Sequence, residues 1–360
     1  MSLNVVSDPV LAKFVRTFRG DAFAGLDGPR EVVYLTPLPG VPERSEEQET
    51  RMTRASEISP ERPADPMTRR ESFTLAVANQ KGGVGKTTTS LNLAASLAAA
   101  ERRTLLIDCD PQGNASSGTG IDRRSIERSV YDVLLGHVGA EAAVSKSALP
   151  FLDVIAATQD LVAAEIELID QPNRASVLRE ALLAVKEQYD FIILDCPPSL
   201  GLLTVNALTA ADRVIVPLQC EYFALEGLTQ LMATIDRIKA SLNPTLTVEG
   251  IVLTMFDGRN SLTHQVADEV RGHFHVFETV IPRNVRLSEA PSHGKPALLY
   301  DAQSRGALAY LSLAREVSER LGSVAPRSTP AATSSDLAAE PPPAAKRPAS
   351  KPKPKMATKT

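Results

Sequence analysis

A stretch of ten residues, Asn79–Thr88, has the composition of a phosphate-binding loop, and it reads NQKGGVGKTT. Glycines let a backbone turn tightly and aim successive N–H groups at phosphate oxygens, and a following helix adds its positive N-terminal end. In such a loop Lys86 reaches the β- and γ-phosphates, Thr87 ligates Mg²⁺ and Thr88 bonds the α-phosphate. The sequence therefore predicts an ATP and Mg²⁺ site whose loop residues are Lys81, Gly82, Gly83, Val84, Gly85, Lys86, Thr87 and Thr88.

This loop departs from the ordinary P-loop at two positions. The ordinary form has a glycine five residues before Gly85, where this chain has Gln80. The chain also carries an additional lysine, Lys81, at the front of the loop. The resulting pattern, KGGVGKTT, is the deviant Walker A form.

Three aspartates stand at the ends of apolar, strand-like runs. Asp108 and Asp110 follow LLI, and Asp195 ends FIILD. The carboxyl ends of parallel strands form the edge of a sheet where ligands bind, so these carboxylates are expected near the phosphate loop. Asp195 has the Walker B position, from which it would hold Mg²⁺ through a water; a strand-end helix cap is the alternative. For Asp108 a structural role in loop bonding stays as open as a functional one, whereas Asp110 is expected to be functional.

Short apolar runs alternate with helix-type stretches from Phe73 to about Leu321, which predicts one doubly wound α/β domain at residues 73–321. Runs that are apolar on both faces are typical of a mostly parallel sheet covered by helices on each side. The predicted strands are Thr74–Asn79, Thr104–Asp108, Leu152–Ala156, Phe191–Asp195, Arg213–Pro217 and Gly250–Thr254. The predicted helices include Thr87–Ala100, Ala175–Glu187 and Leu225–Leu242.

The two ends of the chain differ in composition from this central part. Residues 1–72 are rich in Pro, Glu and Arg from Pro42 onward, and residues 322–360 are rich in Pro, Ala and Lys, so both are expected to be disordered. A short amphipathic piece, Val10–Phe18, is too isolated to be a helix-turn-helix DNA reader. Met67, just before the central part, is a candidate for the start of the natural protein, and this hypothesis stays open. The basic tail either solubilises the chain or attracts DNA weakly.

Composition restricts the kinds of partner. Aromatic residues make up 4% of the chain and Trp is absent, which disfavours a base-stacking platform for single-stranded nucleic acid. The net charge of −4 means that any DNA contact must come from a local basic patch. Cys109, Cys196 and Cys220 lack disulfide or metal-ligand spacing and are expected to be buried thiols in a reducing cytoplasm. We expect a soluble, cytoplasmic protein without a signal peptide or membrane span.

The order of these motifs resembles the ParA/Soj partitioning ATPases of bacterial chromosomes and plasmids, which use the deviant Walker A loop. The matching segments are KGGVGKTT, LLIDCDPQGN, FIILDCPPS and the late stretch VIPRNVRLSEAPSHGKP, within residues 73–321. The late stretch narrows the match to the chromosomal ParA/Soj group, because a general ATPase would not need it. The resemblance implies a P-loop NTPase fold.

The resemblance also implies roles at the phosphates. Lys81 would reach across a dimer interface to the nucleotide of the partner, with Gly82 packed against the partner's loop and two ATP molecules between the protomers. Asp110 would orient the attacking water, and Asp108 would belong to the Mg²⁺ and loop shell.

Further roles implied by the resemblance concern the base and DNA. Pro282 and Asn284 would flank the adenine, and Asn206 would also approach it. The ATP dimer would bind double-stranded DNA without sequence preference through Arg259 and Arg286, whose alternative is ordinary solvated charge. A ParB-type centromere-binding protein would stimulate hydrolysis, and the protein would associate with the nucleoid.

Three alternative hypotheses about function compete with this one. A ParA-like ATPase that positions another cargo would share every ATP-site residue. A MinD-like ATPase recruited to membranes would need an amphipathic C-terminal helix, and this tail has no apolar face. A redox protein like the nitrogenase iron protein would need a cysteine pair bridging a cluster between subunits, whereas the cysteines here follow strand-like runs.

Overall fold

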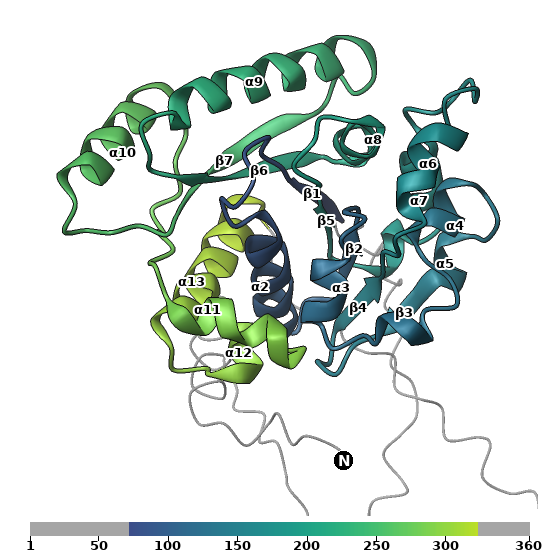
Figure 1. The fold of residues 1–360 in the computed structure, drawn as a ribbon, viewed down its shortest axis with the longest axis horizontal. Helices are drawn as coiled ribbons and strands as arrows, with labels where there is room; N and C mark the ends of the chain where they lie inside the picture. Colours follow the sequence, from purple (N-terminus) through teal and green to yellow (C-terminus); the bar gives the residue numbers. More distant parts are fainter. Residues whose placement is uncertain (1–71, 323–360) are drawn as a thin grey trace, which may run out of the picture. The chain divides into compact units, whose positions relative to one another are not determined.

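A computed structural model describes residues 72–322, and Figure 1 shows them as a central sheet with helices on both faces. The sheet has seven strands in the order β3-β4-β2-β5-β1-β6-β7, and every pairing is parallel except that of β3 with β4. The strands are β1 (Phe73–Val77), β2 (Thr104–Asp108), β3 (Val144–Lys146), β4 (Leu152–Ile155), β5 (Phe191–Asp195), β6 (Arg213–Gln219) and β7 (Thr247–Thr254). This architecture confirms the predicted doubly wound α/β fold. The predicted N- and C-terminal extensions, with Val10–Phe18 and Met67, lie outside the described residues.

Two apolar cores lie on opposite faces of the sheet. One core packs the sheet against α2 (Lys86–Ala99), α11 (Val285–Glu289), α12 (Ala297–Tyr300) and α13 (Arg305–Arg320). The other packs it against α4 (Val130–Leu134), α6 (Leu161–Glu167), α7 (Val177–Leu182), α8 (Leu202–Ala210), α9 (Ala224–Ser241) and α10 (Ser261–His273). Short elements connect these layers: α3 (Asn114–Gly118), α5 (Ala140–Ala143), η3 (Arg123–Ser125), η4 (Lys186–Gln188) and η5 (Ala290–His293). The central strands β1, β2 and β5 are almost entirely apolar and buried because both of their faces are covered.

Helix α2 is buried along almost its whole length. Small residues such as Ala94, Ala95 and Ala98 let it approach the sheet and α13 closely, which suits close packing of a helix in a protein interior. The Asn92 side chain accepts a hydrogen bond from the backbone N–H of Ala297 at 2.8 Å, and Thr89 shares one with the Tyr310 hydroxyl at 3.1 Å. The phosphate loop therefore leads into a helix that neighbouring elements hold rigidly.

Two features differ from the sequence prediction. The antiparallel edge strand β3 has only three residues, none of them buried, so it has no apolar alternation to reveal it. The predicted helix Ala175–Glu187 is instead α7 followed by the turn η4. Leu182 at the end of α7 and Val185 just before η4 are both buried, so the apolar spacing continues although the helix does not.

No helix among residues 72–322 combines the length and the apolar character that crossing a bilayer requires.

Candidate active site

Parallel pairing brings the predicted phosphate loop and two of the aspartates to one edge of the sheet. Strand β5 lies between β1 and β2, and its last residue, Asp195, is in register with Val77 on one side and Asp108 on the other. The loop that follows β1 leads to Gly85, which caps the N-terminus of α2 with a left-handed φ of 88°. A side chain at this position would be strained, which explains the glycine.

Lys86 is buried at the bottom of this loop, with 7% of its surface exposed. Its Nζ donates a hydrogen bond to the carbonyl oxygen of Lys81 at 3.0 Å. Burial lowers the pKa of Lys86, and the nearby charge of Asp195 opposes that shift. A desolvated ammonium beside backbone N–H groups is suited to binding phosphate oxygens.

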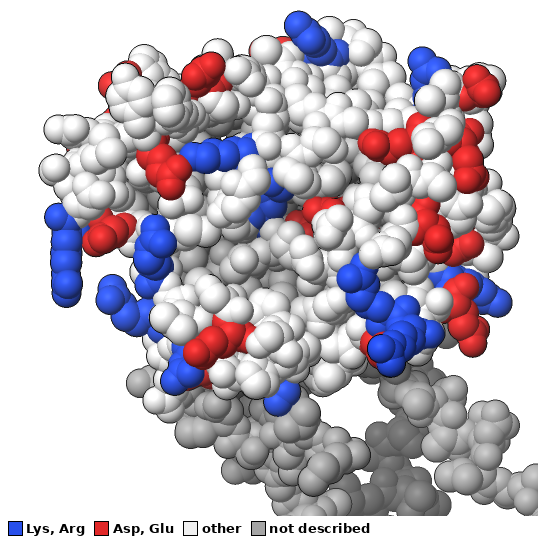
Figure 2. Space-filling view, in the orientation of Figure 1, with Lys and Arg blue, Asp and Glu red and all other residues white. Residues whose placement is uncertain are grey.

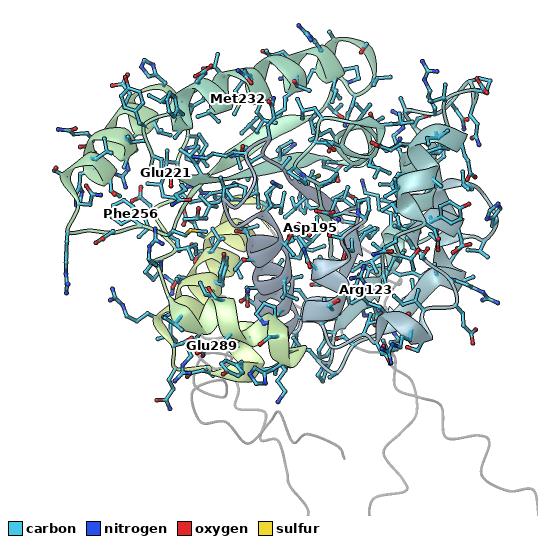
Figure 3. The ribbon with its side chains drawn as sticks, in the orientation of Figure 1. Arg123, Asp195, Glu221, Met232, Phe256 and Glu289 are labelled. Carbon is cyan, nitrogen blue, oxygen red and sulfur yellow. The ribbon has the colours of Figure 1, made fainter. Side chains whose placement is uncertain are left out.

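The ammonium group of Lys81 has a different partner, because it forms an ion pair with Glu221, which follows β6. Asn79 shapes this front part of the loop, since its Oδ1 accepts a hydrogen bond from the N–H of Lys81 at 3.0 Å. The Nδ2 of Asn79 donates to the carbonyl oxygen of Pro217 at 2.8 Å. Figure 3 shows Glu221 well away from Asp195, which lies near the start of α2. The two lysines of the loop therefore have separate environments.

Asp195 has the properties of a cation ligand. It is fully buried, and its Oδ1 accepts a hydrogen bond from the Ser90 hydroxyl at 2.7 Å, whereas its Oδ2 has no hydrogen-bond partner among residues 72–322. Burial, aided by the charge of Asp108, raises the pKa of Asp195 to about 8. A buried carboxylate oxygen without a donor fits Mg²⁺, a hard cation that prefers oxygen ligands. Thr87 and Asp195 are the residues that would hold it. Sequence reasoning missed Ser90, which lies one helical turn beyond Lys86.

This raised pKa predicts that Mg²⁺ affinity depends on pH. The proton on Asp195 has to leave before the carboxylate binds a cation, so affinity is expected to rise by about tenfold per pH unit between pH 6 and 7.5 and to level off above pH 8. Calorimetric titration of Mg²⁺ into the nucleotide-free protein measures the slope. Asp195→Asn removes the titrating group and is expected to bind Mg²⁺ weakly with no such slope; an equal slope in that variant would rule out Asp195 as its source.

Asp108 anchors the segment after β2. Its Oδ2 accepts hydrogen bonds from the backbone N–H and the hydroxyl of Ser116 at 2.8 and 2.7 Å, and its Oδ1 accepts one from the N–H of Asp110 at 3.2 Å. Burial raises the pKa of Asp108 to about 6, and the hydrogen bonds from Ser116 oppose the shift. Of the two roles left open by the sequence, this geometry favours the structural one, because both oxygens already have donors.

Asp110 begins the turn between β2 and α3. It is 8% exposed, and its Oδ1 accepts a hydrogen bond from the N–H of Gln112 at 2.9 Å. The charge of Asp110 also acts on Lys86 and Asp195, because it opposes the lowering of the pKa of Lys86 and adds to the raising of the pKa of Asp195. Asp110 is thus part of the same electrostatic cluster at the sheet edge.

A cavity of about 560 Å³ opens beside the phosphate loop. Its walls include five of the predicted nucleotide-binding residues, which are Gly85, Thr87, Thr88, Pro282 and Asn284. The segment after β7 and the start of α11 therefore come together with the phosphate loop, as expected for a base-binding wall. Asn284 caps α11 by accepting a hydrogen bond from the N–H of Arg286 at 2.9 Å, which leaves its amide nitrogen as the group to meet a ligand.

Asn206 does not line this cavity. It is fully buried in α8, where its Nδ2 donates to the carbonyl oxygens of Arg174 at 2.6 Å and Leu202 at 3.0 Å. Its Oδ1 accepts a hydrogen bond from the N–H of Leu178 at 3.3 Å. Asn206 therefore connects α8 with the start of α7, and its amide has no free edge to offer adenine in this conformation.

The cavity also has walls that sequence reasoning missed, among them Thr254, Met255, Arg283 and Tyr310. The Thr254 hydroxyl donates to the carbonyl oxygen of Val84 at 2.8 Å, so the end of β7 supports the loop directly. Met255 has a φ of 50°, an uncommon conformation for a residue with a side chain, and such residues concentrate at functional sites. Among these four residues, only Thr254 had a signal in the sequence, which was its position at the end of a predicted strand.

Arg259 and Arg286 lie outside the cavity. Arg259 is exposed in the loop between β7 and α10, and no ion pair joins its side chain to another of the described residues. Arg286 on α11 forms ion pairs with Glu289 at 2.8 Å and Asp301 at 3.3 Å. Figure 2 shows Lys and Arg side chains along the left and lower-left edge of this face, on the side of α10 and α11.

The three cysteines are buried near the ends of β2, β5 and β6, as the sequence predicted.

Comparison with known proteins shows similarity to partitioning proteins of the ParA and Soj type. A family model described as an AAA domain matches residues 72–248. A chromosome partitioning protein ParA from Myxococcus xanthus is 57% identical over 255 residues, which cover 70% of this chain and 90% of that protein. The sporulation initiation inhibitor protein Soj from Bacillus subtilis is 56% identical over 245 residues, covering 68% and 97%.

Solved structures agree with the fold and the ligand. Cobyrinic acid a,c-diamide synthase from Mycobacterium smegmatis, solved with bound ADP and magnesium, has a TM-score of 0.61 at 37% identity and covers 72% of this chain and all of that one. The cell division ATPase MinD from Pyrococcus furiosus has a TM-score of 0.59 at 25% identity, covering 69% and 99%. A phosphate loop, a buried strand-end aspartate and an adjoining cavity account for ATP and Mg²⁺ at this site. The chain belongs to the ParA/Soj family of chromosome-partitioning ATPases.

Proposed function

We propose that this ATPase is a dimerising switch for DNA segregation, in which ATP closes two protomers around a pair of nucleotides and hydrolysis reopens them. The position of Lys81 carries the proposal. Neither loop lysine lines the cavity that Thr87 and Thr88 share with Pro282, but Lys86 is buried, whereas the side chain of Lys81 is 37% exposed. Gly82 is exposed, and apart from Gly82 itself and its two neighbours in the chain no atom of the described residues lies within 4 Å of the place where a Cβ would stand. A lysine and a bare backbone on the outer side of the loop are accessible to the nucleotide and loop of a second copy.

Different residues of the site would have different roles in ATP binding and hydrolysis. Lys86 and the backbone N–H groups of the loop bind the phosphates, and Pro282 and Asn284 flank the base. Bound Mg²⁺ would spread the negative charge that develops as the γ-phosphoryl group leaves. Asp110, which follows β2 at the same edge of the sheet, would orient the attacking water. Slow basal turnover is expected of such a switch, because its two states are read by partners.

Exposed arginines would give the ATP dimer its affinity for double-stranded DNA. Arg259 is available for a phosphate, whereas Arg286 is already neutralised by Glu289 and Asp301. We therefore expect Arg259→Ala to weaken DNA binding more than Arg286→Ala. A dimer that loses one phosphate contact in each protomer should lose about 2 from the slope of log affinity against log salt. Fluorescence anisotropy with random-sequence duplexes at several salt concentrations measures both quantities.

The same measurement has a control on a different helix. Arg315 on α13 is half-exposed and pairs with Glu319, so Arg315→Ala removes one positive charge without changing the proposed DNA surface. It is expected to bind DNA as the unchanged protein does. Equal losses in the three variants would show that only net charge matters and would remove the assignment to Arg259.

The partner protein and the location in the cell follow from the same proposal. A ParB-type centromere-binding protein would bind the ATP dimer and stimulate hydrolysis, and the dimer would collect on the nucleoid in the cytoplasm. Co-sedimentation with DNA in the presence of ATP, ADP or no nucleotide, at two salt concentrations, tests the central claim. We expect retention only with ATP and less of it at high salt; retention that ignores the nucleotide would contradict the switch.

A further inference from the structure

We infer that Glu221 is a positioning residue that holds Lys81 to its own protomer until ATP binds, so that the Lys81–Glu221 ion pair sets the threshold for dimer closure. This inference rests on the proposed function, since it assumes that Lys81 acts on the nucleotide of a second copy. The inference adds Glu221 to the residues that control the dimer. It also adds a monomeric state in which Lys81 is paired with Glu221, and this ion pair has to break before the dimer closes.

The ion pair is built by two neighbouring strands. Lys81 follows β1 and Glu221 follows β6, and these strands are paired in parallel, with Val77 in register with Ile215. Lys81 Nζ contacts Glu221 Oε2, and the two side chains are 37% and 47% exposed. Strand pairing therefore places both residues at the same edge of the sheet, although 140 positions separate them in the sequence.

The main chain on each side of the pair is fixed by hydrogen bonds. The N–H of Lys81 donates to Asn79 Oδ1, and Asn79 is in turn bonded to Pro217 on β6. The N–H of Glu221 donates to the carbonyl oxygen of Gln219 at 2.9 Å, and its own carbonyl oxygen accepts from the N–H of Ala224 at 2.9 Å. Fixed backbones keep the two residues within reach of each other, so forming the ion pair needs no ordering of the main chain and is opposed only by the entropy of the two side chains.

Both lysine side chains of the phosphate loop thus have partners within the protomer in the absence of nucleotide. The ammonium of Lys86 bonds the carbonyl oxygen of Lys81, and the ammonium of Lys81 bonds Glu221. A triphosphate offers Lys86 charged oxygens, which are stronger acceptors than a carbonyl group. Nucleotide binding would therefore first free the carbonyl oxygen of Lys81 from Lys86. The ion pair with Glu221 would then be the remaining side-chain contact that holds Lys81 within its own protomer.

The residues after Glu221 mark the same edge as a surface for a second copy. Tyr222 and Phe223 are 77% and 66% exposed, and their rings pack edge to face with centroids 5.0 Å apart. Two large exposed aromatic side chains beside a charged pair are a common composition for a protein interface. Glu221 precedes these two residues directly in the sequence and contacts Lys81 of the phosphate loop, so closure of a dimer at the rings would disturb that contact.

The size of the effect follows from symmetry. An exposed ion pair of this kind changes an equilibrium by about two- to fivefold. A symmetric dimer has to break two of them, so removing the pair is expected to lower the dimer dissociation constant by about 4- to 25-fold, the square of the single effect. The difference in dimer dissociation constant between the protein with and without the ion pair should shrink at high salt, because salt screens exposed charges.

Glu221→Gln tests this inference against a matched control. Glu226 is exposed in the first turn of α9, five residues further along, so Glu226→Gln makes the same change of charge without touching Lys81. Analytical ultracentrifugation with Mg²⁺ and a non-hydrolysable ATP analogue gives the dimer dissociation constant. We expect tighter dimers with Glu221→Gln and no change with Glu226→Gln. Equal or weaker dimerisation with Glu221→Gln overturns the inference.

A direct chemical test separates this inference from the proposed function. Carbodiimide joins a carboxylate to an amine in contact, so the nucleotide-free protein should give a Lys81–Glu221 cross-link within one chain, detected by peptide mass spectrometry, and the analogue-bound dimer should give much less. A cross-link that is absent without nucleotide, or unchanged by the analogue, refutes the cis contact as a switch. Lys81→Ala reports on the proposed function alone: if it dimerises normally with the analogue, the trans role of Lys81 fails whatever Glu221 does.

Discussion

Lys86→Ala is expected to lower the affinity for ATP by about 100-fold or more. The ammonium of Lys86 is buried beside the phosphate loop, where each lost hydrogen bond to a charged oxygen weakens binding by about tenfold or more. No lysine of the described chain lines the cavity beside Thr87 and Thr88, so no lysine there substitutes for Lys86. Calorimetry with ATP and Mg²⁺ measures the change.

The fold should survive this substitution. The lowered pKa of Lys86 shows that its burial is unfavourable for the charged form, so removing it relieves a desolvation cost while leaving the carbonyl of Lys81 unpaired. Thermal unfolding without nucleotide is expected to stay within a few degrees of the unchanged protein. ATP affinity that stays the same in a folded Lys86→Ala variant would contradict the phosphate-loop assignment.

Asp110→Ala is expected to bind ATP and to lose turnover by about 100- to 10,000-fold, the usual contribution of a positioned acid–base group. Without hydrolysis the ATP dimer should accumulate and stay on DNA. Phosphate release measures the first effect, and size-exclusion chromatography with light scattering measures the second. Turnover at the original rate would remove Asp110 from catalysis.

A second substitution at Asp110 distinguishes chemistry from loop structure. The Oδ1 of Asp110 accepts a hydrogen bond from the N–H of Gln112, and asparagine keeps that acceptor while losing the negative charge. If Asp110 acts on water, Asp110→Asn should be as slow as the alanine variant. Recovery of turnover with asparagine would mean that Asp110 acts by shaping the turn before α3.

Local sequence patterns were sufficient to predict the phosphate loop, the Walker B aspartate and six of the seven strands of the sheet. Each depends on neighbours along the chain: glycines and lysines within ten residues, or an apolar run that ends in a carboxylate. All six predicted strands are present, and the parallel order of the sheet carries Asp108 and Asp195 to the same edge as the loop. Pro282 and Asn284 could be placed near the base only through the family resemblance, and the cavity now brings them to the loop.

Contacts between side chains far apart in the sequence were decided by tertiary structure alone. The sequence contains Asn206, Arg286 and Glu221, but no local signal shows that the first joins α8 to α7, that the second is neutralised by Glu289 and Asp301, or that the third pairs with Lys81. Whether a polar side chain is available to a ligand depends on which donors and acceptors packing brings within about 3 Å, and that depends on the whole fold. The chemistry of the site is therefore determined by the sequence, whereas the free or engaged state of each charged group is determined by the three-dimensional packing.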